Sequence, residues 1–103
     1  MGKKLRKLIY SDKTTHYYYL CPGCGYEHAF SPDIHTFNGD VNNPTISPSL
    51  LHDNPQHHHT CHSYIKNGEI QFLGDCWHEL KGQTVQLPDN PNPDYNYLDE
   101  YNG

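Results

Sequence analysis

The sequence TCHSYIKNGEIQFLGDCWH, residues Thr60–His78, contains two short runs of alternating apolar and polar residues on either side of an Asn-Gly pair. Asn-Gly between such runs is the strongest short signal for a two-residue β-hairpin turn. The turn fixes which residues face each other across the hairpin. The predicted pairs are Lys66 with Glu69, Tyr64 with Gln71, and His62 with Leu73.

This register sorts the hairpin into two faces, because successive side chains of a strand point to opposite sides. The inward face is the apolar one, and it consists of Cys61, Ser63, Ile65, Ile70, Phe72, Gly74 and Cys76. The opposite face carries His62 and Asp75 together at the open end of the hairpin. We therefore expect one side to hold a metal ion while the other carries out chemistry.

The composition predicts one small domain with a limited core. The chain has 103 residues, of which 34% are hydrophobic, and it contains eight Gly and eight Pro. Domains of this size bury little apolar surface and commonly need a disulfide or a metal ion for stability. The first residues, MGKKLRKLIY, lack the apolar segment of a secretory signal, so we expect reduced thiols and a cytoplasmic location, or the host cytoplasm for a phage gene.

The composition argues against nucleic acid and membranes as partners. Seven Lys and Arg against twelve Asp and Glu give a net charge of -5, the wrong sign for a protein that binds nucleic acid by neutralising phosphates. No apolar run approaches the roughly 20 residues that a membrane helix needs. A protein partner or substrate remains the expectation.

The CPGCG segment at residues 21–25 has the spacing of a zinc knuckle, in which a tight turn directs two thiolates at one ion. The predicted ligands of one structural Zn²⁺ are Cys21, Cys24, Cys61 and Cys76. A second possibility replaces one of the later cysteines by a histidine, with His62, His78 and His28 as candidates. A third is that Cys61 and Cys76 are simply buried thiols or a disulfide. For the run at 57–59, a solvated histidine loop is favoured over a native metal site.

The expected fold is small, mainly β and loop-rich: a zinc-ribbon-like domain in which one structural zinc clamps two hairpins, Tyr17–Phe30 and Thr60–His78. A Pro-rich segment between them is predicted to be mostly ordered loop, with short extended pieces near Thr45–Leu51. We expect a single domain over residues 1–88 and an acidic, flexible tail over residues 89–103.

Six short segments resemble a small family of phage, prophage and bacterial proteins. They are CPGCG (21–25), FNGD (37–40), NPTISPSL (43–50), CHSYI (61–65), GEIQFLGDCWHEL (68–80) and GQTVQLP (82–88). Relatives occur in bacterial operons that encode ubiquitin-like proteins with E1-like and E2-like enzymes, where they are considered peptidases. The resemblance therefore implies a peptidase that processes or removes a ubiquitin-like modifier.

A serine peptidase needs a nucleophile, a base within hydrogen-bond reach and a group that orients the base. Ser49, His62 and Asp75 supply these three types, and the hairpin register already places the last two on one face. The segment around Ser49 must then fold over that face. Ser47 and Thr45 are competing nucleophiles, and Asp40 is an alternative carboxylate.

Two other interpretations compete with a serine peptidase. Ser49 can be an ordinary turn residue and His62 an exposed strand residue, in a non-catalytic zinc-ribbon module that binds a protein, such as a phage-encoded anti-defence factor. A zinc-water hydrolase is the other, with ligands drawn from His62, Asp75, His78 and a cysteine. An all-thiolate site argues against it, because such a site leaves no open position for water.

Overall fold

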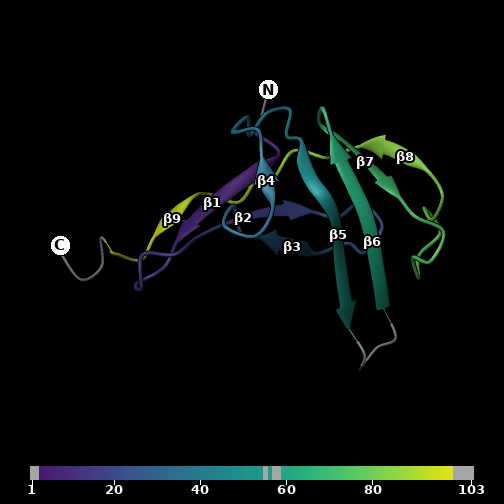
Figure 1. The fold of residues 1–103 in the computed structure, drawn as a ribbon, viewed down its shortest axis with the longest axis horizontal. Helices are drawn as coiled ribbons and strands as arrows, with labels where there is room; N and C mark the ends of the chain where they lie inside the picture. The colour runs from purple at the N-terminus through teal and green to yellow at the C-terminus, as the bar shows by residue number, and fades with distance from the viewer. Residues whose placement is uncertain (1–2, 55, 57–58, 99–103) are drawn as a thin grey trace.

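The structure is a computed structural model that describes residues 3–54, 56 and 59–98 (Figure 1). In this part of the chain, nine strands form two sheets. The strands are β1 (Leu5–Ile9), β2 (Thr15–Leu20), β3 (Glu27–Phe30), β4 (Thr36–Phe37), β5 (Ile46–Asn54), β6 (His59–Lys66), β7 (Glu69–Phe72), β8 (Thr84–Gln86) and β9 (Tyr95–Asn96). No helix among these residues has the length and apolar character that a membrane span requires.

The first sheet has the strand order β3-β2-β1-β9. Strands β1, β2 and β3 are antiparallel neighbours, and β9 pairs with β1 in parallel. Arg6 on β1 forms two hydrogen bonds to the Glu27 carboxylate on β3, at 2.7 and 2.8 Å. This two-pronged ion pair ties the first strand to the third across β2, because a guanidinium and a carboxylate match in geometry.

The second sheet has the order β4-β5-β6-β7-β8, and the Thr60–His78 hairpin forms its centre. The predicted register of β6 and β7 is confirmed: Lys66 pairs with Glu69 and Tyr64 with Gln71. Asn67 and Gly68 both have positive φ, at 51° and 80°, as the favoured two-residue hairpin turn requires. Burial alternates from Thr60 along β6 and along β7, so the predicted inward face is confirmed for Cys61, Ser63, Ile65, Ile70, Phe72 and Cys76, whereas Gly74 is exposed.

The extended piece predicted near Thr45–Leu51 is part of β5, which is the longest strand among the described residues and continues to Asn54. Its pairing with β6 shifts between Ile46, which faces Ile65, and Leu50, which faces Ser63. Over this interval β5 advances by four residues while β6 advances by two, so β5 bulges outward at residues 47–49. Pro48 lies within the bulge, where the ladder of hydrogen bonds is interrupted and a residue without an N–H is tolerated.

The core lies between the two sheets. Leu5, Tyr19 and Phe30 come from the first sheet, and they pack with Ile65 and Phe72 of the second in one cluster of buried side chains. In Figure 1, β2 and β3 pass behind β5 and β6 at a steep angle. The small, mainly β fold is thus confirmed, but its basis is two packed sheets rather than two hairpins held by a metal alone.

Part of the predicted tail follows the first sheet. The buried Asn90 side chain donates a hydrogen bond to Glu27, at 2.8 Å, and its backbone N–H donates to the carbonyl of Lys3. Beyond it, β9 adds to the edge of β1. Residues 99–103 lie outside the described residues, and the flexibility of the tail stays a prediction.

Candidate functional site

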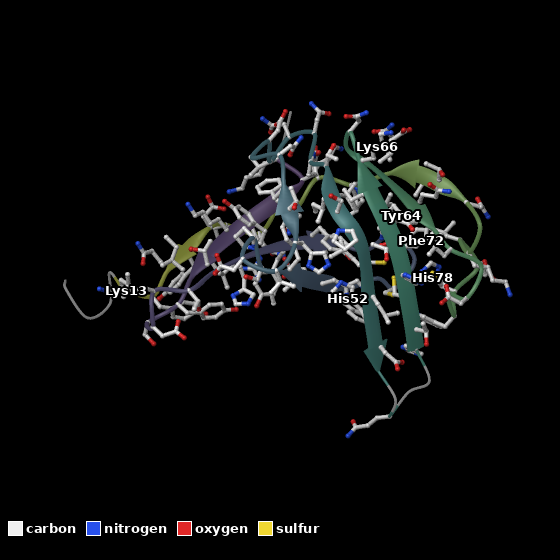
Figure 2. All side chains as sticks on the ribbon, viewed as in Figure 1. Lys13, His52, Tyr64, Lys66, Phe72 and His78 are labelled. Atoms are coloured by element: carbon white, nitrogen blue, oxygen red, sulfur yellow. The ribbon has the colours of Figure 1, made fainter. Side chains whose placement is uncertain are left out.

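Sulfur atoms gather where the two sheets meet at the base of the hairpin, beside β6 between His52 and His78 (Figure 2). Three thiols and one imidazole come together there, with ligand atoms all within 4.8 Å of one another: Cys21, Cys24, His28 and Cys61. Cys21 and Cys24 belong to the CPGCG turn, His28 lies on β3 and Cys61 lies on β6. The cluster therefore joins the first sheet to the second.

The distances in this cluster fit one tetrahedral zinc ion. The Cys21 and Cys61 sulfurs are 3.7 Å apart, and the Cys24 sulfur is 3.4 Å from Nε2 of His28. Ligand bonds of zinc to sulfur and nitrogen place tetrahedral donors roughly 3.5 to 3.8 Å from one another. Three cysteines and one histidine are also a common donor set for structural zinc.

The pKa values of the cysteines in this cluster favour the binding of a cation. A hydrogen bond from the Cys61 thiol, together with one from the Cys24 backbone amide, lowers the pKa of Cys21 to about 3. The hydrogen bond to Cys21 and burial raise the pKa of Cys61, because two adjacent thiolates repel each other. A bound divalent cation relieves this repulsion, since it stabilises both sulfurs as thiolates.

A second group of residues lies on the outer face of the same hairpin. Ser49 lies in the β5 bulge, His62 is on β6, and Asp75 is in the tight turn after β7. Nε2 of His62 is 3.0 Å from the Ser49 hydroxyl, and Nδ1 is 3.2 Å from the Asp75 carboxylate. The structure thus brings the three predicted residues into one hydrogen-bonded chain.

The bulge explains how Ser49 reaches the histidine. Leu51 lies directly opposite His62, so Ser49, two residues earlier on the same strand, is its diagonal neighbour. The bulge at residues 47–49 redirects the chain at this point, and the imidazole of His35 hydrogen-bonds the Ser49 carbonyl at 3.2 Å. The order of contacts, hydroxyl to imidazole to carboxylate, is that of a serine hydrolase.

Comparison with known protein families agrees with this geometry. Residues 3–73 match the model of the bacterial ubiquitination-like system serine protease family (BubE). The chain belongs to the BubE family. The match includes Ser49 and His62 and ends two residues before Asp75. Neither the curated proteins nor the solved structures contain a match to the chain.

For a BubE serine protease, the alternative candidates for the nucleophile and the orienting carboxylate must be compared with Ser49 and Asp75. Thr45 accepts a hydrogen bond from the Asn67 backbone in the hairpin turn, at 2.9 Å, so its hydroxyl has a structural role. The Asp40 carboxylate accepts hydrogen bonds from the backbone amides of Asn42 and Asn43, in a turn of its own. Among the described residues, Asp75 is therefore the carboxylate that contacts His62.

The position of Cys76 differs from the prediction for the metal site. The described residues do not bring all four cysteines into one group: Cys76 belongs to a second one, with Cys61 and His78. Its buried sulfur accepts a hydrogen bond from the His62 backbone N–H and donates one to the His62 carbonyl, at 3.3 and 3.2 Å. The Leu73 N–H also donates to the His62 carbonyl, so the Cys76 sulfur satisfies the His62 backbone at the point where the pairing of β6 with β7 ends.

His28 is the fourth member of the first group of possible metal ligands. It follows Cys24 by four residues and lies opposite Tyr19 on β3, so its side chain turns toward the metal cluster from the first sheet. The sequence favours Cys76 as the fourth ligand, because zinc sites are commonly recognised by pairs of cysteines. The short spacing between Cys24 and His28 is the sequence signal for His28 in its place.

Gly23 shows why the knuckle turn needs glycine. The ring of His78 packs so closely against it that a Cβ atom at residue 23 would lie 2.1 Å from the ring. His78 is itself buried, with Nε2 3.8 Å from the Cys61 sulfur. The loop after β7 therefore closes over the knuckle and shields the cluster from solvent.

Proposed function

We propose that this chain is a serine peptidase that cleaves a ubiquitin-like modifier from its precursor or from a target protein. Ser49 is the nucleophile, His62 the general base and Asp75 the residue that orients the base. The observation that carries the proposal is the pair of hydrogen bonds that join the Ser49 hydroxyl to His62 and His62 to Asp75. Membership in a family of ubiquitination-like serine proteases supports it.

The proposed reaction has two stages. Nε2 of His62 removes the hydroxyl proton as Ser49 Oγ attacks the carbonyl carbon of the scissile bond. The carbon–nitrogen bond then breaks, and the proton passes from His62 to the leaving amine, which leaves an acyl group on Ser49. Water next attacks the ester with His62 again as the base, which releases the carboxylate product and restores the serine.

Asp75 acts through His62. Its carboxylate accepts the Nδ1–H, which holds the neutral ring with Nε2 facing the serine and stabilises the imidazolium that forms during the reaction. The Asp75 side chain is 56% exposed and that of His62 only 26%. Water screens an exposed ion pair, so the orientation of the ring contributes more than the charge.

The metal cluster has a separate proposed role. Cys21, Cys24, His28 and Cys61 would hold a structural zinc ion, which would supply a cross-link between the two sheets. Its donor from β6, Cys61, lies on the inner face of that strand, whereas His62 points to the outer face. The metal would therefore fix the strand that carries the base and leave the chemistry to side chains.

A zinc-water hydrolase fits this arrangement less well. That mechanism needs an open coordination position that water can reach, with His62 and Asp75 among the ligands. Neither residue belongs to the two groups of possible metal ligands among the described residues, and the donors of both groups are largely buried. A non-catalytic module would in turn have no need of a serine held against a histidine and a carboxylate.

The test uses an active-site probe and a protein substrate together. The metal-replete protein is treated with a fluorophosphonate, and the labelled residue is located by mass spectrometry. The same preparation is incubated with a ubiquitin-like protein of such a system that carries a C-terminal extension. We expect label on Ser49 and release of the extension.

Two variants complete this test. Ser49→Ala should retain the fold and abolish both label and cleavage, with a loss of roughly 10⁴-fold or more in rate. The matched control is Ser11→Ala, which removes an exposed hydroxyl in the turn between β1 and β2 and should retain both. Full activity in Ser49→Ala, or label on Ser47, would exclude the proposed nucleophile.

A further inference from the structure

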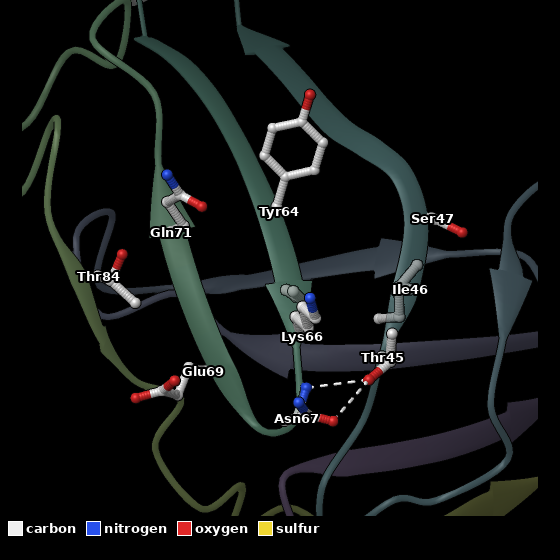
Figure 3. Close-up of a pocket in the computed structure, with 10 residues that line it drawn as sticks. Thr45, Ile46, Ser47, Tyr64, Lys66, Asn67, Glu69, Gln71 and Thr84 are labelled. Atoms are coloured by element: carbon white, nitrogen blue, oxygen red, sulfur yellow. Dashed lines mark hydrogen bonds between the residues drawn. The ribbon is translucent and has the colours of Figure 1, made fainter.

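A groove of about 620 Å³ crosses the outer face of the second sheet (Figure 3). Strand β6 forms its floor, with β5 on one side and β7 and β8 on the other. The two hydrogen bonds between Thr45 and Asn67 cross its end at the hairpin turn. The side chains that define it are those of Thr45, Tyr64, Lys66, Glu69, Gln71 and Thr84.

The other end of the groove leads to the reacting residues. Tyr64 follows His62 by two residues on β6, so both side chains project from the same face about 7 Å apart. Leu51 lies opposite His62 on β5. Leu51 is 60% exposed and Tyr64 is 45% exposed. The Ser49–His62 pair therefore lies between two exposed apolar side chains, which is unusual on so polar a chain.

The lining indicates what kind of molecule fits. Lys66 and Glu69 face each other in the register of the hairpin, so their charges offset each other within the groove. Glu69 also accepts a hydrogen bond from Gln86, at 3.2 Å. Gln71 and Thr84 face each other across β7 and β8 and offer neutral donors and acceptors, which suit the peptide groups of an extended chain.

The position of Tyr64 restricts what can lie near Ser49. Its ring stands at the end of the groove nearest His62, where Figure 3 shows it rising from β6 above the level of Lys66. A chain that enters the groove from the serine must pass this ring. The ring offers a large apolar contact to a chain that lies across it.

We propose that this groove binds the polypeptide segment adjoining the scissile bond, as an extended chain with uncharged side chains, and that Tyr64 is its main contact. The inference rests on the proposed function, because it places the substrate relative to Ser49. The groove volume lies within the range of pockets that hold a ligand of a few residues. Tyr64 thus determines specificity without taking part in the proton transfers.

The experiment compares two reactions of the same protein. Fluorophosphonate labelling requires Ser49 and His62 but no peptide in the groove, whereas cleavage of the ubiquitin-like protein with a C-terminal extension requires both. In Tyr64→Ala we expect the ratio of cleavage to labelling to fall roughly 10- to 100-fold, mostly through KM, as loss of one aromatic contact predicts. The matched control is Tyr95→Ala, which removes a tyrosine of 38% exposure on β9 in the other sheet.

A second variant guards against a misfolded Tyr64→Ala protein. Gln71→Leu retains bulk on the exposed side of β7 and removes the neutral hydrogen-bonding group, and it should lower the same ratio by a smaller factor. An unchanged ratio in both variants, with labelling intact, overturns the groove and leaves the peptidase in place. If the parent protein is neither labelled nor active, the proposed function fails, and the groove inference fails with it.

Discussion

The two faces of β6 carry different chemistry in alternate residues. Cys61, Ser63 and Ile65 point inward, and each is almost fully buried. His62 and Tyr64 point outward and are partly exposed. One strand therefore contributes to the metal cluster and the core through odd-numbered residues and to the proposed active site through even-numbered ones.

The difference follows from what each kind of site needs. A structural metal site gains from exclusion of water, which would otherwise compete for the ion and solvate the thiolates. A peptidase needs the opposite, because its substrate is a protein segment that must reach the hydroxyl. In a strand of period two, a shift of a single residue would exchange the two sites, so the Asn67-Gly68 turn fixes both at once.

The largest expected effect concerns the zinc ion proposed for the inner face. Removal of this ion by a strong chelator, or the substitution Cys21→Ala, should unfold the protein, because structural zinc in small domains contributes apparent binding free energies of roughly 10 kcal/mol or more. Circular dichroism and metal content measured on the same samples test this. Three thiolates and one imidazole predict one equivalent of zinc.

Ser49→Ala is the matched comparison for this loss, since it should retain the metal and the thermal transition of the parent protein. A metal-free protein with the same midpoint of unfolding would contradict the role assigned to the cluster.

On the outer face, the second largest effect is expected for substitution of Asp75, the residue proposed to orient the base. Asp75→Asn should lower kcat by roughly 10²- to 10⁴-fold, because the amide favours the wrong tautomer of His62 while the fold is unchanged. Steady-state cleavage and chemical denaturation separate the two effects. Glu79→Gln, an exposed change a few residues away, should leave the rate unaltered, and an equal loss there would count against the assignment.

Two neighbouring residues on β6, Ile65 and Lys66, allow the two faces to be compared by their contribution to the free energy of unfolding. Ile65→Ala removes a side chain that is buried against the first sheet and should lower the free energy of unfolding by about 2 to 5 kcal/mol. Lys66→Ala, on the outer face, should change it by about 0.5 kcal/mol or less. Urea denaturation measures both, and similar losses for the two variants would show that the alternation of burial is wrong.

The last prediction concerns the pH dependence of stability and a histidine of the inner face. Burial lowers the pKa of His52 to about 4, and the adjacent His28 adds to this effect. The two ring centroids are 4.1 Å apart, so a positive charge on one ring opposes protonation of the other. The unfolded chain takes up this proton near pH 6.5. The contribution of neutral His52 is therefore present above pH 6.5 and is lost as the pH falls toward 4.

This loss amounts to about 3 kcal/mol over the interval if His52 acts alone. His52→Gln should flatten that part of the curve of unfolding free energy against pH. The measurement requires constant zinc activity, because protons also compete for the metal ligands. A curve of unchanged slope in the variant would mean that other groups dominate the acid response.

Local signals predicted the hairpin well. The turn, the register and the two faces depend on residues that are adjacent in sequence, and the structure has them as expected. The residues of the proposed triad came from the same register combined with a family resemblance. Their hydrogen bonds could not be read from the chain, because Ser49 lies 13 residues from His62 and reaches it through a bulge.

The expectation for residues 31–59 placed extended structure at the right point but made it too short. The piece predicted near Thr45–Leu51 is strand β5, which continues to Asn54, and a bulge accommodates Pro48 within it. The metal ligands show a similar limit. Cys76 has the right residue type and spacing, yet the turn after β7 directs its sulfur to the His62 backbone, and His28 reaches the cluster from another sheet.

By itself, the sequence determined a small β protein, a hairpin with one inward and one outward face, and a cluster of thiols able to bind a cation. These properties depend on composition, on period-two alternation and on the left-handed preference of Asn-Gly, all of which act over a few residues. Only the tertiary structure decided which donors share one site and that Ser49 lies against His62. Those contacts join segments distant in sequence, and the packing of one sheet on the other together with the bulge in β5 sets them.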